Sequence, residues 1–241
     1  MSPDAYMAVS EEVLLSAIDK QKVSKQARFI HDQFRSLILH PQFPCPGAKT
    51  AFSRGTYRMG VFEKMADTSS TQLLGQALAA FVAERESMDR EFTTFIASFK
   101  EKVMPTADCG FTELLWNQLQ LLHEIDQSEW DPKVSSDPEA ANFSFSFGGC
   151  AFFVIGIHSE SWRYARRFGW PTLVFNAHDQ FERLRARGEF QQFRDTVRKR
   201  DVALQGCSNP ILEDHGLSSE ARQYSGEQLS QEWKCPFHCK R

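Results

Sequence analysis

The clearest pattern of hydrophobic and polar positions lies between residues 143 and 177. Phenylalanines alternate with serines over Phe143–Phe147, which is the period-two pattern of a strand with one buried face. Gly148-Gly149 suits the positive φ angles of a tight hairpin turn. The following run, Cys150–Ile157, is apolar on both faces and therefore predicts an interior strand.

A polar corner follows this interior strand. His158 ends the strand, Ser159 can cap a short helix, and Thr172–Phe175 predicts a third strand after Pro171. The short helix would carry Trp162, Arg163, Arg166 and Arg167. Ligands usually sit at the ends of central strands in α/β sheets, so we expect a site here.

The rest of the chain reads mainly as helices. Helical periodicity predicts Ser10–Lys20, Ser24–Leu39, Ser70–Glu86, Thr112–Ile125, His178–Arg187 and Glu189–Gln205. Strands are predicted at Tyr57–Phe62 and Phe92–Phe99, and loops at Gln42–Ala51, at Asp126–Ala141 and through most of the chain from Gly206. We expect one α+β (or α/β) domain with a mixed central β-sheet flanked by helices. Residues 1–40 would form N-terminal helices on a unit that spans 41–241.

Composition and charge are those of an ordinary soluble protein. The 241 residues are 41% hydrophobic with a net charge of −3, which gives no electrostatic case for nucleic acid. There is no signal pattern and no apolar run of about 20 residues, so we expect a cytoplasmic protein without a membrane partner. The 21 phenylalanines fit either a Phe-rich core or a deep apolar pocket.

The six cysteines are scattered, so a disulfide framework is not expected. Cys235 and Cys239 lack a second pair at zinc-site spacing. Cys45 stands out because prolines flank it and Gly47 follows, which fixes the backbone around the thiol. It could be a haem thiolate, a nucleophile paired with His158 or His178, or a buried thiol. Phosphate-binding glycine loops and the Gly-x-Ser-x-Gly elbow are missing from the sequence.

From about residue 40 to its end, the chain resembles the YqcI/YcgG family. The motifs that carry the resemblance are Phe43–Ala48, Glu113–Gln120, Gly156–Phe168, Pro171–Asn176, Arg198–Asp201, Gly206–Pro210, Ser219–Gly226 and Lys234–Phe237. Studied members of that family look like haem-dependent N-hydroxylases of guanidine groups, such as the arginine N-hydroxylase of D-cycloserine biosynthesis and the pre-guanitoxin N-hydroxylase.

The resemblance implies a haem b cofactor and a monooxygenase that hydroxylates the guanidine group of arginine or an arginine-like small molecule. It also implies dioxygen or peroxide as oxidant and a separate electron donor, because this chain has no reductase segment. Two other classes stay open, a haem-binding gas sensor without turnover and a cofactor-free cysteine enzyme. Homodimerisation also stays open.

The resemblance further suggests roles for the residues of the haem site. Cys45 would be the axial ligand of the haem iron, since a thiolate donates electron density that favours O–O cleavage. His158 would be the alternative ligand or a proton donor on the opposite side of the haem. The guanidinium groups of Arg163, Arg166 and Arg167 would suit the haem propionates, although they could equally form a solvated helix face.

The remaining expected contacts lie in the other motifs. A cationic guanidine calls for carboxylates, so Glu113 and Glu220 are candidates for substrate binding, with Glu220 also a candidate for catalysis. Asn176, Arg222 and Gln223 are further substrate candidates, and Tyr224 is a cofactor candidate.

Overall fold

The computed structural model describes residues 1–88, 91–102, 110–207, 209 and 219–239. Within them, one seven-stranded mixed sheet runs through the molecule in the order β2-β1-β3-β4-β7-β6-β5. The strands are β1 (Met7–Ser10), β2 (Val13–Ser16), β3 (Tyr57–Phe62), β4 (Thr94–Phe99), β5 (Phe145–Phe147), β6 (Cys150–Ile157) and β7 (Thr172–Ala177). β3 and β4 are parallel, and the other neighbouring strands are antiparallel. The protein is therefore a single α+β domain, as the sequence predicts.

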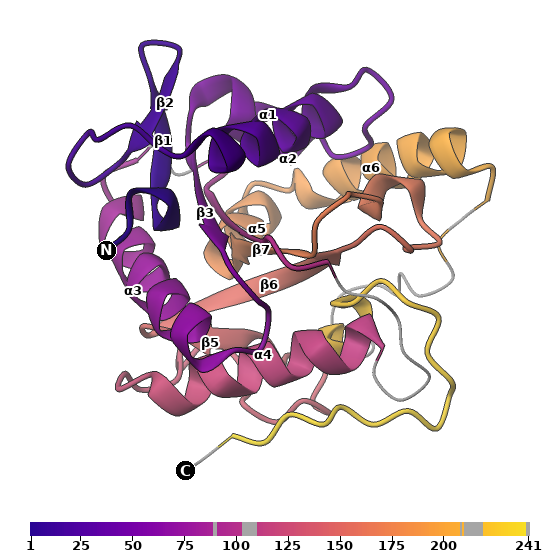
Figure 1. Ribbon diagram of the computed structural model, residues 1–241. Coiled ribbons are helices and arrows are strands. Elements are labelled where there is room, and N and C mark those ends of the chain that lie inside the picture. Colours follow the sequence, from indigo (N-terminus) through magenta and orange to yellow (C-terminus); the bar gives the residue numbers. More distant parts are fainter. Residues whose placement is uncertain (89–90, 103–109, 208, 210–218, 240–241) are drawn as a thin grey trace.

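Helices cover both faces of this sheet. They are α1 (Lys25–Leu39), α2 (Pro46–Arg54), α3 (Thr68–Arg85), α4 (Phe111–Ile125), α5 (His178–Ala186) and α6 (Phe190–Gln205). Helices α3 and α4 lie on one face, whereas α1, α2, α5 and α6 lie on the other (Figure 1). Within the described residues, no helix has the length and apolar character needed to cross a bilayer.

The alternation of side chains along the strands divides the core into two layers. In β4, Phe95 and Phe99 pack toward α3 and α4, whereas Ile96 packs toward α1 and α2. In β6, Val154 belongs to the first layer and Ile157 to the second. Both faces of β6 are therefore covered, which confirms the prediction of an interior strand.

The hairpin between β5 and β6 is confirmed in detail. Gly148 and Gly149 have φ angles of +63° and +70°, and Phe147 pairs with Cys150 across the turn. Two successive positive φ angles are typical of a type I′ turn, which glycine adopts without steric cost.

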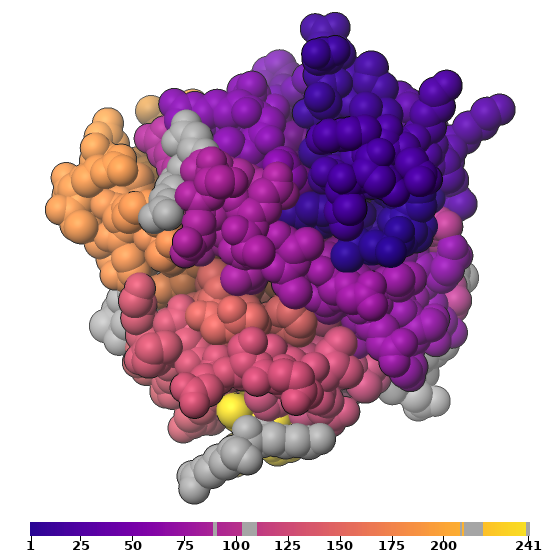
Figure 2. Space-filling model, turned by 90° about the vertical axis from the view of Figure 1, so that its left-hand side faces the viewer, coloured from indigo at the N-terminus to yellow at the C-terminus, as the bar shows by residue number. Residues whose placement is uncertain are grey.

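The prediction of a helix at Ser10–Lys20 is wrong. β1 and β2 form a hairpin there, with Glu11 and Glu12 at its turn at φ angles of +48° and +66°. β1 also pairs with β3 through Met7 and Met59, so tertiary pairing overrides the helical periodicity. Residues 1–40 consequently hold a 3₁₀ turn (Pro3–Ala5), one hairpin and one α-helix, and the hairpin protrudes from the molecular surface (indigo, Figure 2).

Two further local predictions are wrong. The expected loop Gln42–Ala51 contains the first turns of α2, because Pro46 occupies the first helical position, where a missing N–H costs nothing. The expected short helix after Ser159 is only a 3₁₀ turn, Tyr164–Arg166, because a bridge between His158 and Arg167 curls this segment back.

The other predicted helices and strands are confirmed to within a few residues, and Asp126–Ala141 forms no helix or strand. Cys109 lies outside the described residues, and so do residues 208 and 210–217 of the expected irregular stretch. The later part of that stretch, residues 219–239, runs along α4 as an extended segment (yellow, Figure 1). Its backbone is tied to α4 by Gln120, which bonds the carbonyl and the N–H of His238.

Candidate functional site

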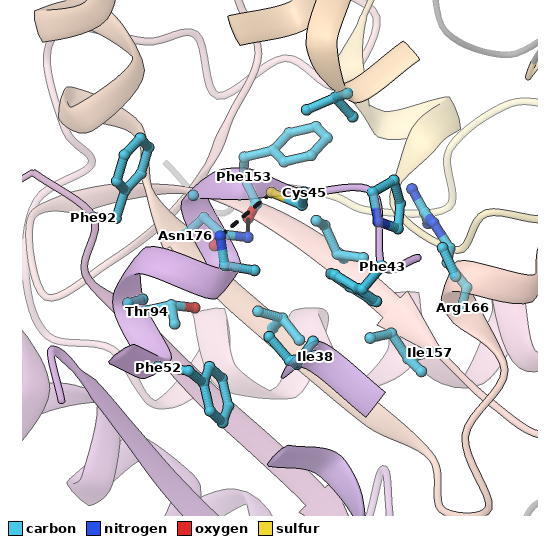
Figure 3. Close-up of a pocket in the computed structure, with 18 of the residues that line it drawn as sticks. Ile38, Phe43, Cys45, Phe52, Phe92, Thr94, Phe153, Ile157, Arg166 and Asn176 are labelled. Atoms are coloured by element: carbon cyan, nitrogen blue, oxygen red, sulfur yellow. Dashed lines mark hydrogen bonds between the residues drawn. The ribbon is translucent and has the colours of Figure 1, made fainter. Parts of the chain in front are cut away.

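A cavity of about 260 Å³ lies between the sheet and the layer formed by α1, α2, α5 and α6. Its walls are mainly apolar. Phe34 and Ile38 come from α1, Phe52 comes from α2, and Phe153, Ile155 and Ile157 come from β6. Figure 3 shows how side chains from these distant parts of the chain surround the space. Phenylalanine therefore serves both uses that the composition suggested, the core and the pocket.

Cys45 places a thiol on the wall of this cavity. It is the N-cap residue of α2, and its Sγ accepts a hydrogen bond from the N–H of Ala48 at 3.4 Å. Burial raises the pKa of the Cys45 thiol, while the N–H groups of Ala48 and Gly47 and the charge of Arg200 act in the opposite direction. A metal ion that took this sulfur would bind it as the thiolate, and the helix N-terminus would stabilise the negative charge.

Gly47 is required by the aromatic wall beside Cys45. A Cβ atom at Gly47 would lie 2.8 Å from the ring of Phe92 and 3.3 Å from the ring of Phe193. These two rings stack with centroids 5.6 Å apart, and both line the cavity. Glycine thus allows the start of α2 to approach the aromatic pair closely.

A buried ion pair forms another part of the wall. Arg163 is 2% exposed, and its Nη2 donates a hydrogen bond to Oδ2 of Asp201 on α6. Its Nη1 also donates to the carbonyl of Cys207 at 3.4 Å. The two charges compensate each other away from water, so the pair fixes α6 against the segment that follows β6.

Arg166 brings a second guanidinium group to the cavity, and its hydrogen bonds go to neutral groups. Its Nη1 donates to the carbonyls of Gln223 and Tyr224, at 2.9 and 3.1 Å. Among the described residues, no carboxylate forms an ion pair with it. Burial lowers the pKa of Arg166 to about 10, so the side chain still carries its charge at neutral pH. Asp201 acts on this charge only from beyond ion-pair distance, so the cavity wall offers a guanidinium group to an anionic ligand.

Asn176 is the fourth expected site residue on the cavity wall. It faces Phe153 across β6 and β7, and its Nδ2 donates to the carbonyl of Phe153 at 3.3 Å (Figure 3). Thr94 and Gln180 add further polar groups, but the Oε1 of Gln180 already accepts a bond from the N–H of Thr93.

The structure does not bring His158 to Cys45. Ile155 and Ile157 of β6 face the cavity, so the next residue, His158, points to the opposite face of the sheet. There its ring stacks on Phe111 at 4.2 Å, and its Nε2 lies 3.8 Å from Oε1 of Glu227. Burial lowers the pKa of His158. His158 thus lies outside the cavity that holds the thiol.

Five more expected site residues lie outside the cavity lining. Glu113 accepts a bond from the N–H of Gly110 and caps α4, and Arg167 donates to the carbonyl of Ser161 at 2.6 Å. Arg222 bonds the carbonyls of Ser230 and Trp233. Gln223 contributes its backbone carbonyl to Arg166. Glu220 is buried in the C-terminal segment near Tyr224.

Tyr224 belongs to the core on the α4 side of the sheet. Its hydroxyl accepts a bond from the N–H of Phe145 and donates to the carbonyl of Phe152, both at 3.1 Å. Its ring stacks on Trp116 at 5.4 Å. Tyr224 lies outside the lining but contacts two residues in it, because its carbonyl accepts a bond from Arg166 and its ring packs edge-on against Phe153 at 5.6 Å.

Asp201 is a residue of the site that the sequence patterns did not indicate. The residues of α6 that line the cavity are Phe193, Val197 and Asp201, which recur every four positions on one helix face. A carboxylate on an otherwise apolar stripe was the signal that could have identified it. Phe92 and Phe193 were missed as well, because their approach to Gly47 depends on tertiary packing.

The comparisons with known proteins point to one family. The model of the YqcI/YcgG family matches residues 34–238, which is well over half of the chain. No curated protein and no solved structure matches the chain. Within the described residues, no group of three or more His, Cys, Asp or Glu side chains is arranged to hold a metal ion.

Proposed function

Because the chain belongs to the YqcI/YcgG family, we propose that it is a haem-dependent N-hydroxylase that acts on the guanidine group of arginine or an arginine-like small molecule. One observation carries the proposal. The thiol of Cys45, at the N-terminus of α2, shares an apolar cavity with the guanidinium group of Arg166, which has no carboxylate partner among the described residues.

The lining residues suit haem b in three respects, and the cavity of about 260 Å³ would have to widen to admit the porphyrin. The apolar walls suit the porphyrin plane, which has little polar surface. The Cys45 sulfur would hold the haem iron, and the hydrogen bond from Ala48 would tune the donor strength of the sulfur. Arg166 would pair with a propionate, whereas Arg163 is already paired with Asp201 and Arg167 lies outside the lining.

Bound haem would supply the activation of dioxygen or peroxide. Converting an N–H group into N–OH consumes one dioxygen molecule, two electrons and two protons and yields one water, whereas hydrogen peroxide needs no external electrons. With dioxygen, a separate electron donor is therefore required. We place this chemistry in the cytoplasm, in line with the expectation from the sequence.

Asp201 is the candidate for holding the guanidinium group of the substrate. It is the acidic side chain among the described residues that line the cavity, whereas Glu113 and Glu220 lie elsewhere. A substrate guanidinium would compete with Arg163 for this carboxylate, or share it, through bidentate hydrogen bonds.

Haem titration tests the ligand assignment directly. We expect the wild-type protein to gain a Soret band and a ferrous–CO spectrum of the thiolate type. Cys45→Ser should lose the thiolate signature, whereas Cys150→Ser, which removes a thiol outside the cavity, should keep it. A colourless wild-type protein after haem supplementation would contradict the whole proposal.

Turnover tests the enzymatic part separately. The haem-loaded protein is given arginine with peroxide, or with dioxygen and a reductant, and the products are analysed by mass. We expect a product heavier by one oxygen atom. A haem-loaded protein that yields no oxygenated product from any of a panel of guanidines would instead act as a haem-binding sensor.

A further inference from the structure

A buried tyrosine stands directly behind the cavity wall. Tyr57 is 2% exposed, and its ring stacks on Phe52 with centroids 4.0 Å apart and planes 12° apart. Phe52 itself lines the cavity. A single aromatic ring thus separates the phenol from the space in which we place the haem, and the stacked rings are in van der Waals contact.

The phenol is the first member of a hydrogen-bonded chain that leads to the surface. Its Oη lies 2.7 Å from Nε2 of His31, and Nδ1 of His31 lies 2.8 Å from Oδ1 of Asp32. The Asp32 side chain is 60% exposed. A carboxylate only accepts hydrogen bonds, so Nδ1 carries the proton, and the lone pair of Nε2 accepts the phenolic O–H.

Burial and two nearby arginines keep the imidazole of His31 unprotonated, whereas the carboxylate of Asp32 favours the imidazolium. Burial lowers the pKa of His31, as do the charges of Arg35 and Arg28, whereas Asp32 opposes them. The imidazole is therefore neutral at neutral pH. Burial also raises the pKa of Tyr57 to about 12, so the phenol keeps its proton until an electron leaves.

The other three tyrosines lack this arrangement. Tyr6 donates to Glu84, but that carboxylate is held by Arg58 and is a weak base. Tyr224 donates to a backbone carbonyl, which does not take up a proton. Tyr164 is 47% exposed and lies under the guanidinium group of Arg167. Tyr57 alone combines a neutral imidazole acceptor with a ring stacked on the cavity wall.

We propose that Tyr57 is a redox-active tyrosine, which gives one electron to a peroxide-oxidised haem in the cavity and passes its phenolic proton to His31. This inference rests on the proposed function. The O–H bond of Tyr57 would break, its electron would pass to the bound haem, and its proton would form an N–H bond at Nε2 of His31. The products are a neutral phenoxyl radical and an imidazolium ion that faces the carboxylate of Asp32.

The proton transfer is what makes the electron transfer favourable. A phenol that lost an electron but kept its proton would be a cation in an apolar interior, which is costly. Passing the proton along a hydrogen bond already formed leaves the radical neutral and places the positive charge beside an exposed carboxylate. When no guanidine occupies the cavity, this route would remove oxidising equivalents from the haem. It would thereby protect the sulfur of Cys45 from oxidation.

The test uses the haem-loaded full-length protein, treated with hydrogen peroxide without substrate and frozen for electron paramagnetic resonance. We expect a tyrosyl radical in the wild-type protein, its loss in Tyr57→Phe, and its retention in the control Tyr164→Phe. The haem should also bleach severalfold faster in Tyr57→Phe under excess peroxide, because the drain is missing.

Tyr57→Phe leaves Nε2 of His31 without its hydrogen-bond partner, which destabilises the fold. A second variant that keeps Tyr57 therefore tests the same inference. Asp32→Asn changes an exposed side chain and removes the carboxylate that stabilises the imidazolium, so the radical yield should fall severalfold. An unchanged yield in Asp32→Asn, a radical that persists in Tyr57→Phe, or a tryptophan radical in its place would overturn the inference. An absorption spectrum without haem would overturn the proposed function instead, so the two failures are distinguishable.

Discussion

Two opposing influences act on the thiol of Cys45. Burial raises its pKa, whereas the N–H groups at the start of α2 favour the thiolate. Because the raised pKa prevails, the free thiol holds its proton at neutral pH and would have to release it to bind the iron of the proposed haem.

This balance predicts a pH dependence of haem affinity. Below the thiol pKa, each unit of pH lost should weaken binding by up to about tenfold, because one proton competes with the iron for the sulfur. Affinity should accordingly rise with pH, as measured by haem titration over a pH series. Cys150→Ser should keep this slope and Cys45→Ser should lose it. An equally flat profile in all three proteins would exclude Cys45 as the ligand.

Arg166 and Arg167 are adjacent, yet only Arg166 lines the cavity. We predict that Arg166→Gln weakens haem binding by about tenfold or more, since a hydrogen bond to a charged group contributes about 1.5–3 kcal/mol. Arg167→Gln is the matched control and should change the affinity little. Equal effects of the two substitutions, measured by the same titration, would show that Arg166 acts only through net charge.

At the scale of elements, helix α2 is placed by its contact with an aromatic pair. Gly47 lies against the rings of Phe92 and Phe193, and this contact sets where the Cys45 sulfur meets the cavity. The position of the thiol therefore depends on close packing between α2, α6 and the residues before β4.

Replacing Gly47 by alanine should disturb that placement. The added Cβ would lie 2.8 Å from the Phe92 ring, and overpacking of this kind typically costs about 1–3 kcal/mol. We expect a lower free energy of unfolding in urea and weaker haem binding. Gly169→Ala is the control, because a Cβ there meets no atom within 4 Å and the backbone needs no positive φ. If both variants unfold at the same urea concentration as the wild type, the contact of Gly47 with Phe92 does not limit the packing of α2.

In the molecule as a whole, the sheet separates a layer that is a filled core from a layer that contains the cavity. The layer with α3, α4 and the C-terminal segment is an aromatic core, which contains Trp116, Tyr224 and Phe237. The other layer contains the cavity and is closed by the Arg163–Asp201 pair. Arg166 connects the two, because it lines the cavity and bonds the carbonyls of Gln223 and Tyr224.

The buried pair makes a prediction about global stability. Asp201→Asn leaves the charge of Arg163 uncompensated, which should lower the free energy of unfolding by about 3–5 kcal/mol. Glu189→Gln, which removes one partner of an exposed pair with Arg187, should cost about 0–1 kcal/mol. Urea unfolding measures both. In a double-mutant cycle, Arg163→Met combined with Asp201→Leu should cost clearly less than the sum of the single changes, and simple additivity would argue against coupling.

Local patterns in the sequence determined much of the fold. Tyr57–Phe62 and Cys150–Ile157 are strands with the bounds that their residues predict, because apolar runs between turn residues have few other solutions. The predicted helix at Ser10–Lys20 is wrong because β2 within it pairs with β1 in a hairpin, and β1 in turn joins β3, a strand far away in the sequence, through Met7 and Met59. A sequence pattern also does not show which of two adjacent residues in one motif lines a cavity, as Arg166 and Arg167 illustrate.

A proline-flanked thiol, an arginine-rich corner and a strand that ends at His158 are short-range features, so the order of residues is enough to predict them. Which of these features meet depends on the folded arrangement of the chain. Strand alternation places Ile157 in the cavity and His158 on the other face, but the face that receives Cys45 depends on how α2 crosses the sheet. Such a choice is made by long-range packing, which no local pattern encodes.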